Sequence, residues 1–226
     1  MTAARRRPAA AALALVFLLG VAGCGAERRS AVPEVHVVQR GDTLYSVGWR
    51  YGLDYRQLAR WNGIGRDYRI EIGQRLRLRP PPAGNRAASP PAAPKPIERA
   101  LPPPPAWRWP YEGGRVAGSV RQPSGGVGLS VEGTRGGPIR AAADGTVVYT
   151  GTGLLGYGVV VIVNHVNGWL TAYGHNDSVE VKEGQQVTAG QSIARMGLGP
   201  GGRPQLYFEV RQDGKPVDPL GQLPRR

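Results

Sequence analysis

Residues 80–106 divide this chain, because a segment of their composition cannot belong to a packed core. Eleven of these 27 residues are proline, and no apolar side chain recurs with a helical or strand period. Proline fixes φ and donates no backbone hydrogen bond, so the segment favours extended polyproline II structure at about 3.1 Å per residue. We therefore predict a Pro/Ala-rich linker between two folded units, residues 34–79 and 107–226. A ligand for a proline-recognition domain is the alternative function of this segment.

The first 24 residues have the order of an export signal. Arg5-Arg6-Arg7 precede an apolar run from Ala9 to Val21, which is too short to span a membrane, since a spanning helix needs roughly 20 residues. Val21-Ala22-Gly23 then lead to Cys24, the only cysteine, in a sequence that resembles the bacterial lipobox. A lone cysteine makes no internal disulfide, so we predict a signal peptide over residues 1–23, lipidation of Cys24 and a tether over residues 24–33. A free thiol is the alternative.

The lipobox resemblance also implies a location. Gly25 follows Cys24, where Asp would mark retention in the inner membrane, so we expect an outer membrane lipoprotein that faces the periplasm. Removing the signal takes away three Arg and no acidic residue, which lowers the formal charge from +13 to +10. A basic excess can indicate a nucleic-acid partner. An exported chain instead meets anionic lipid headgroups and cell-wall carboxylates, so we expect no nucleic acid; solubility and non-specific attraction to the wall are the plain alternative.

Residues 34–79 predict the order strand, helix, helix, strand. The alternating stretch from Val35 to Val38 is typical of a strand. Leu44, Val47 and Tyr51 then lie at i, i+3 and i+7 on one helix face, with Asp42 or Thr43 as the N-cap and Gly52 as the stop. Asp54 caps a second helix that contains Leu58 and Trp61 and ends at Asn62-Gly63, and a turn and strand from Ile72 to Leu78 close the unit.

Three separated motifs in this unit resemble a LysM module: Gly41-Asp42-Thr43-Leu44, Trp61-Asn62-Gly63-Ile64 and Ile72-Gly73-Gln74-Arg75-Leu76. The resemblance implies that glycan containing N-acetylglucosamine, as in peptidoglycan, lies between two loops. By position, the glycan-binding residues are Gly41, Asp42, Thr43, Leu44, Tyr68, Arg69 and Ile70. Leu44 and Ile70 alternatively belong to the core. Gly48 departs from the helical pattern, because a glycine inside a helix lowers the stability of the helix by about 1 kcal/mol relative to Ala.

Residues 107–226 predict a mainly β unit of short antiparallel strands. Strand patterns cover residues 145–149, 159–163 and 169–173, and Asn167-Gly168 is a strong hairpin signal because both residues tolerate positive φ. From Val181 to Ile193, apolar and glycine residues alternate every three positions, which indicates tight turns between short strands.

This pattern, with Ala141 to Gly145 and Leu206 to Arg211, resembles the β-sheet domain of LytM/lysostaphin-type zinc peptidases. That family carries an H-x-G-x-D motif, a catalytic His on an intervening strand and a final H-x-H-F-E-V-R strand. Here Gly126 and Ser130 stand in the first motif, and Gln205 and Tyr207 replace the two histidines of the last. Only His175 remains at a catalytic position. The fold implied is therefore a degenerate zinc-peptidase domain joined by a Pro-rich linker to a small βααβ LysM module.

Histidine content argues against a working zinc site. A catalytic zinc needs three protein ligands and an open position for water, and the chain has only His36, His165 and His175. Gln and protonated Tyr are poor substitutes for imidazole or carboxylate. We predict no metal, no cofactor and no catalytic residue. His165, beside a predicted turn, is interpreted as structural, and a lone His175 as a packing or hydrogen-bonding remnant.

The order of lipobox, LysM and LytM segments resembles the NlpD-type murein hydrolase activators; residues 202–209 also resemble the related EnvC type. The resemblance implies a non-enzymatic activator of periplasmic N-acetylmuramoyl-L-alanine amidases, acting in septal peptidoglycan splitting and daughter-cell separation. A regulatory amidase helix would enter the emptied groove, where Arg211 could pair with a carboxylate or cap the helix C-terminus. By position, this partner-binding groove includes Val127, Ser130, Tyr157, Val160, His175, Gln205, Tyr207 and Arg211.

The sequence is compatible with two other functions. A passive lipoprotein that tethers the outer membrane to the wall needs only the anchor and the LysM module. An active zinc endopeptidase is the third hypothesis, and the histidine count disfavours it. For the groove itself, the alternative is that Tyr157 and Val160 are core residues and Arg211 is a solvated charge.

Overall fold

The computed structural model describes residues 32–82, 104–123 and 125–225, and the chain from Val32 onward clusters as one compact unit. The predicted signal peptide, Cys24, nearly all of the tether and the central part of the linker lie outside the described residues. Among the residues that are described, no helix is long and apolar enough to cross a membrane.

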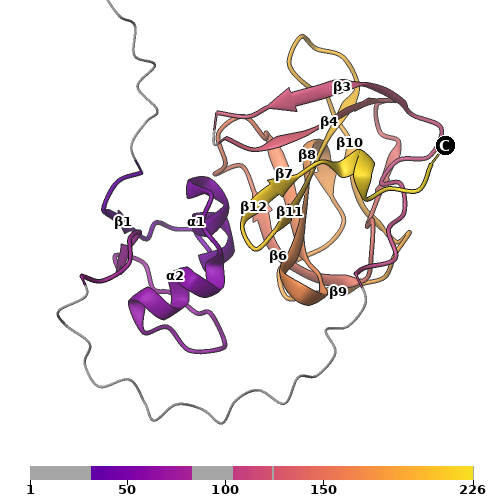
Figure 1. The fold of residues 1–226 in the computed structure, drawn as a ribbon. Coiled ribbons are helices and arrows are strands. Elements are labelled where there is room, and N and C mark those ends of the chain that lie inside the picture. Colours follow the sequence, from indigo (N-terminus) through magenta and orange to yellow (C-terminus); the bar gives the residue numbers. More distant parts are fainter. Residues whose placement is uncertain (1–31, 83–103, 124, 226) are drawn as a thin grey trace, which may run out of the picture. The chain divides into compact units, whose positions relative to one another are not determined.

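The N-terminal unit has the predicted βααβ order, as Figure 1 shows. Strand β1 (Val35–Val37) pairs antiparallel with β2 (Arg75–Arg77), and helices α1 (Leu44–Tyr51) and α2 (Tyr55–Asn62) lie between them in sequence. Thr43, rather than Asp42, is the N-cap of α1: its hydroxyl accepts from the backbone N–H of Ser46 at 3.1 Å, in a capping box. Left-handed glycines, Gly52 and Gly63, end both helices.

Gly48 has a packing role that the helical pattern does not predict. The chain turns directly from α1 into α2, and an ideal Cβ on Gly48 would lie 2.9 Å from the carbonyl oxygen of Leu53. Backbone cannot yield as a flexible side chain does. The glycine that weakens the helix in isolation is therefore needed for the close approach of the next segment.

We expect Gly48→Ala to destabilise the protein, although the same substitution in an exposed helix gains about 1 kcal/mol. The added methyl would force the connection to Leu53 outward, and overpacking of this kind costs roughly 1–3 kcal/mol. Urea denaturation of the full chain measures the change, with Arg60→Ala, at an exposed position of α2, as the near-neutral control. A gain in stability would show that the backbone contact is unimportant.

The C-terminal unit is built on an antiparallel sheet, as expected (Figure 1). Its main strand order is β3-β4-β11-β8-β7-β6-β9, with β12 beside β11, and β10 joining β8 to β5. The strands are β3 (Arg115–Arg121), β4 (Val127–Glu132), β5 (Pro138–Arg140), β6 (Gly145–Gly151), β7 (Val159–Asn164), β8 (Trp169–Val179), β9 (Gln186–Val187), β10 (Ser192–Met196), β11 (Gln205–Gln212) and β12 (Lys215–Val217).

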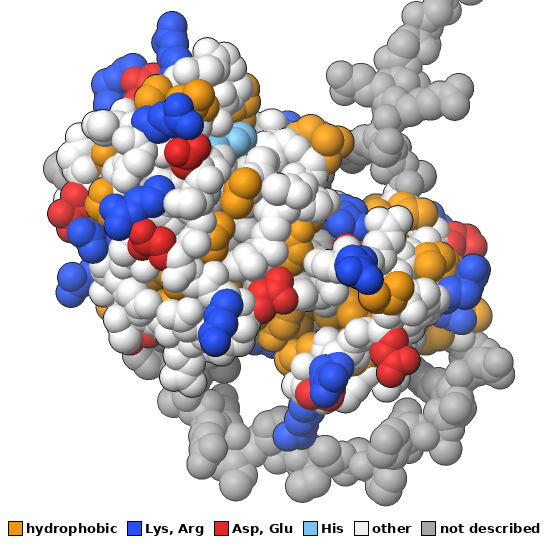
Figure 2. Space-filling view, turned by 180° about the vertical axis from the view of Figure 1, so that it is seen from behind, with side chains coloured by type: hydrophobic (Ala, Val, Ile, Leu, Met, Phe, Trp, Pro, Cys, Tyr) orange, Lys and Arg blue, Asp and Glu red, His pale blue; other side chains and the backbone are white. Residues whose placement is uncertain are grey.

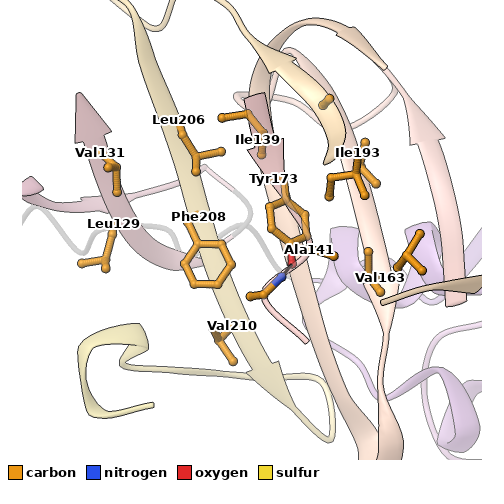
Figure 3. Close-up of a cluster of buried hydrophobic side chains, with 14 of the residues drawn as sticks. Leu129, Val131, Ile139, Ala141, Val163, Tyr173, Ile193, Leu206, Phe208 and Val210 are labelled. Carbon is orange, nitrogen blue, oxygen red and sulfur yellow. Dashed lines mark hydrogen bonds between the residues drawn. The ribbon is translucent and has the colours of Figure 1, made fainter. Parts of the chain in front are cut away.

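One face of this sheet forms the unit's own core. Successive side chains of a strand point to opposite faces, and Leu206, Phe208 and Val210 of β11 all enter the same buried cluster. Figure 3 shows them beside Leu129 and Val131 of β4, with Tyr173 of β8 next along the sheet. Every member of this cluster lies between residues 107 and 223. Residues 107–226 therefore contain a complete core.

The opposite face, which we call the second face, is also buried. Its strand residues are Val160 and Ile162 of β7, Leu170 and Ala172 of β8, and Tyr207, Glu209 and Arg211 of β11. The run from Val159 to Val163 is apolar without alternation, a pattern typical of strands covered on both sides. The apolar members join one cluster with Leu44, Val47 and Trp49 of the N-terminal unit.

Charged side chains do not gather into one basic surface on the face drawn in Figure 2. Lys and Arg groups are scattered there, with Asp and Glu between them. On this face, the distribution favours general solubility and diffuse attraction to anions over a dedicated nucleic-acid track.

Candidate functional site

Strand alternation brings the decayed peptidase positions onto the second face. Gln205, Tyr207, Glu209 and Arg211 occupy alternate positions of β11, while the intervening residues enter the core. Ser130 of β4 lies directly across from Tyr207. Ser130 therefore converges with Gln205, Tyr207 and Arg211, although these residues come from segments about 80 positions apart in sequence.

A buried carboxylate lies at the centre of this arrangement. The hydroxyls of Tyr157 and Tyr207 each donate to Glu209 Oε2 at 2.7 Å, and Arg211 Nε donates to Oε1 at 2.6 Å. The side chains of Glu209 and Arg211 are 0 % and 1 % exposed. Because a buried polar group is tolerated only when it is hydrogen-bonded, these three donors are what allow the carboxyl group of Glu209 to be buried here. Sequence reasoning missed Glu209, although its alternation with Tyr207 and Arg211 was a usable signal.

The Glu209 carboxylate fills the space next to Gly126. An ideal Cβ on Gly126 would lie 2.3 Å from Glu209 Oε2 and 2.5 Å from Oε1. A Cβ on Gly128 would lie 2.7 Å from Cζ of Tyr207. At the position that the resemblance assigns to the first zinc ligand, groups from β11 thus occupy the volume that a side chain would need.

The other decayed positions are satisfied by one another. Ser130 Oγ donates to Gln205 Oε1 at 3.1 Å, which links the position of the lost Asp to that of a lost His. Burial, followed by the nearby charge of Glu209, raises the pKa of Tyr207 far above its ordinary value, so its oxygen stays protonated. Within residues 32–82, 104–123 and 125–225, no three His, Cys, Asp or Glu residues form a cluster suited to a metal ion. This donor set does not fit the zinc of the peptidase fold.

His175 lies beside this cluster because its backbone departs from strand alternation. Its φ is +63°, in the left-handed region that non-glycine residues seldom adopt. The imidazole lies 6.1 Å from the Tyr207 ring, centroid to centroid, in an edge-on arrangement. Burial lowers the pKa of His175, which keeps the ring neutral at neutral pH. A neutral imidazole packed against a tyrosine agrees with the interpretation of a remnant.

His165 has a structural environment, as its sequence context indicated. Its Nδ1 lies 2.7 Å from the carbonyl oxygen of Asp144, and its Nε2 lies 2.8 Å from Thr171 Oγ1. Burial lowers its pKa to about 4, although the Asp144 carbonyl favours the protonated form.

The remaining groove residues differ in their surroundings. Tyr157 and Val160 are fully buried in the same cluster as Tyr207. Val127 is half-buried at the start of β4 and is not a member of either buried cluster, so its side chain is not brought together with the others. Arg211 is not a solvated charge, since its guanidinium is buried against Glu209 and the Trp49 ring.

The expected glycan residues border a separate pocket of about 320 Å³. Those that line it are Asp42, Thr43, Tyr68, Arg69 and Ile70, joined by Tyr45, Asp67, Thr146, Val147, Val148, Glu183 and Gly184. Leu44 is different: its side chain is 0 % exposed, because the first residue of α1 points into the core. Leu44 is therefore a core residue, which is the alternative that the sequence left open, and its side chain is not accessible to a sugar. Gly41 is exposed but outside the pocket lining.

Asp42 is held rigidly at the pocket wall. Its carboxylate accepts from Gln39 N–H at 2.9 Å and from Arg50 Nη2 at 3.0 Å, and His36 Nε2 lies 2.8 Å away. Burial opposes ionisation, but these hydrogen bonds and the charge of Arg50 together lower the pKa of Asp42. Asp42 therefore orders the loop at neutral pH, whatever else it contacts.

The fold defines a class: a LysM module followed by a domain of the M23 peptidase type. The model of the LysM domain matches residues 36–79, and that of peptidase family M23 matches residues 124–219.

Relatives of known name agree with this class. The lipoprotein NlpD/LppB homolog of Pseudomonas aeruginosa is 38% identical, over 92% of this chain and 82% of that protein. The lipoprotein YgeR of Escherichia coli is 36% identical, over 94% and 93%. The murein hydrolase activator NlpD of E. coli is 32% identical, over 84% and 68%. The chain belongs to the NlpD family of LysM- and M23-containing lipoproteins, which confirms the resemblance drawn from its motifs.

We expect Gly126→Ala to destabilise the protein by roughly 1–3 kcal/mol, as overpacking of a buried site does. The new methyl would meet a carboxylate that three donors hold in place. Thermal and urea unfolding measure the loss. Gly221→Ala is the matched control, since a Cβ there meets nothing within 4 Å; equal effects of the two substitutions would contradict this packing.

Proposed function

We propose that the chain is a non-enzymatic activator of periplasmic N-acetylmuramoyl-L-alanine amidases that acts in septal peptidoglycan splitting. The observation that carries this proposal is the replacement of a metal site by the network of Tyr157, Tyr207, Glu209 and Arg211. Such a network has neither an open metal position nor a nucleophile. It offers an aromatic and cationic surface, which is the composition of a protein-binding site. The names of the relatives, which include murein hydrolase activators, support the same conclusion.

A helix from the amidase is the partner that this surface suits. The second face carries Tyr157, Val160 and Tyr207, which suit apolar contact, and Arg211, which suits a helix C-terminus. All four side chains are buried within the chain, so a partner helix would have to replace the segment that covers them. Activation then needs only that the partner bind more tightly when its helix has left its own active site. A shift of that closed–open equilibrium from 1:99 to 99:1 takes about 5.5 kcal/mol of differential affinity, within the range that a few buried anchors supply.

The N-terminal elements would confine this activity to the cell wall. We propose that the LysM module binds peptidoglycan glycan through the pocket beside Asp42 and Ile70, and that lipid on Cys24 anchors the chain in the outer membrane. Each lipid CH₂ that enters the bilayer contributes about 0.8 kcal/mol, so several acyl chains make the anchor effectively permanent.

We expect purified residues 107–226 to stimulate dye release from labelled sacculi by a native amidase. The fragment is suited to this test because it contains a complete core. Tyr207→Ala should lower the stimulation at least about tenfold, because truncating a buried aromatic anchor typically costs roughly 2 kcal/mol or more. Leu220→Ala, at a side chain that is 49% exposed, is the control, and circular dichroism checks that each variant is folded.

Three results would count against the activator. No stimulation of any native amidase by this fragment would reject it. Unchanged cell separation after deletion of residues 107–226 would instead favour the passive tether between membrane and wall. Dye release by the fragment alone would indicate an active endopeptidase.

The glycan pocket makes a separate prediction. Ile70→Asp should weaken binding of the full chain to chitooligosaccharides about tenfold, because the apolar contact it removes contributes roughly 1.5 kcal/mol. Ile72→Asp is the matched control, since Ile72 is 70% exposed and outside the pocket lining. Titration calorimetry measures both. Equal losses would mean that the sugar does not lie against Ile70.

A further inference from the structure

The last turn of α1 contacts the part of the second face assigned to the partner helix. The guanidinium carbon of Arg211 lies 3.9 Å from the centroid of the Trp49 ring, and Arg211 Nη1 donates to the Trp49 carbonyl oxygen at 2.7 Å. The Trp49 and Tyr157 rings meet edge-on, with centroids 6.3 Å apart. Trp49 is 2 % exposed and Arg211 is 1 % exposed. These residues are therefore covered by the chain itself.

The same segment makes further contacts around this centre. Arg50 Nη2 donates to the carbonyl oxygen of Gly153 at 3.1 Å, and Arg56 Nη1 lies 3.3 Å from Asp213 Oδ1. Gly214, in the turn after β11, approaches so closely that an ideal Cβ would lie 2.5 Å from the backbone nitrogen of Asp54. These three contacts, two by charged side chains and one between backbone segments, thus surround the contact between Arg211 and the Trp49 ring.

The interaction between Arg211 and α1 is a helix C-terminal cap. The last carbonyls of a helix lack intrahelical donors and carry partial negative charge, so a cationic donor stabilises them. Trp49 lies in the final turn of α1. Arg211 was expected to contact the C-terminus of a guest helix or a carboxylate, and it contacts both within its own chain.

This covering is imperfect, which makes it reversible. Trp49 Nε1 and Arg211 Nη2 are buried without a hydrogen-bond partner. A buried donor left without an acceptor is costly, whereas water or a different helix bearing an acceptor would satisfy it. A competing helix that offers a carboxylate or a carbonyl to Arg211 Nη2 thus has an advantage over α1.

We propose that the LysM module masks the amidase-binding surface, with α1 occupying the place of the partner helix, and that the activator works only after this module moves away. The inference rests on the proposed function and names its regulation. Residues 36–79 then have two roles in one chain: they bind glycan, and they keep the second face covered.

A substitution that separates the two surfaces should raise activity. In the full chain, Gly214→Asn places a side chain against Asp54, and Asn tolerates the left-handed conformation at this position, where φ is +78°. We expect half-maximal amidase stimulation at about tenfold lower activator concentration, as when the competent fraction rises from about a tenth to nearly all molecules. Gly136→Asn is the matched control: its φ is +76°, and a Cβ there meets nothing within 4 Å.

A charge reversal tests the same mask without crowding a turn. Arg56→Glu places like charges together at a partly exposed pair, so we expect about threefold stronger stimulation, and Asp213→Arg in the same chain should restore the parent value. Unfolding transitions of all variants confirm that they are folded.

The fragment of residues 107–226 separates failure of the mask from failure of the function. If the fragment stimulates amidase more strongly than the full chain and the two variants approach the fragment, the mask is supported. If the full chain, its variants and the fragment stimulate equally, the mask is rejected and the activator stands. If none of them stimulates any amidase, the proposed function fails and the mask with it.

Discussion

The buried Glu209 carboxylate is the constraint on which the rest of the site depends. It can be buried only because two tyrosine hydroxyls and one guanidinium nitrogen donate to it. That requirement fixes the orientation of Tyr157, Tyr207 and Arg211, and it excludes any side chain at Gly126. The position that would hold a metal ligand in the peptidases is thereby committed to a different network. A loss of catalytic residues alone would have left a cavity, whereas here the cavity has been repacked.

The two faces of one sheet give this domain two separate cores. Leu206, Phe208 and Val210 pack inside residues 107–226, and the alternate residues of the same strand pack on the other side with side chains of the N-terminal unit. Arg211 joins the two sets, because it pairs with Glu209 of its own strand and stacks on Trp49. A surface proposed for a partner is thus also a surface that stabilises the described chain, and binding must replace contacts rather than simply add them.

Local signals predicted the elements well, since their causes lie within a few residues. Left-handed glycines end both helices, an Asx or hydroxyl cap begins each, and Asn167-Gly168 turns the chain with both φ values positive. Where prediction failed, the cause was distant in sequence or in space. The helical pattern presents Gly48 only as a weakness of α1, because it does not show that the carbonyl oxygen of Leu53 lies 2.9 Å from the place of a Cβ on Gly48. Leu44 was assigned to the sugar by position, although it begins a helix whose inward face is core.

By itself, the sequence determined the family and the βααβ and antiparallel β architectures, because each follows from residue identity and short spacing, and it predicted that the histidines a zinc peptidase needs are missing. Only the tertiary structure decided what replaced them. Gly126 and Glu209 are 83 positions apart in sequence, and their approach depends on how β4 registers against β11. The contact between Arg211 and Trp49 likewise joins residues 34–79 to residues 107–226. The periodicity within each of these segments does not specify which face of the other it will contact.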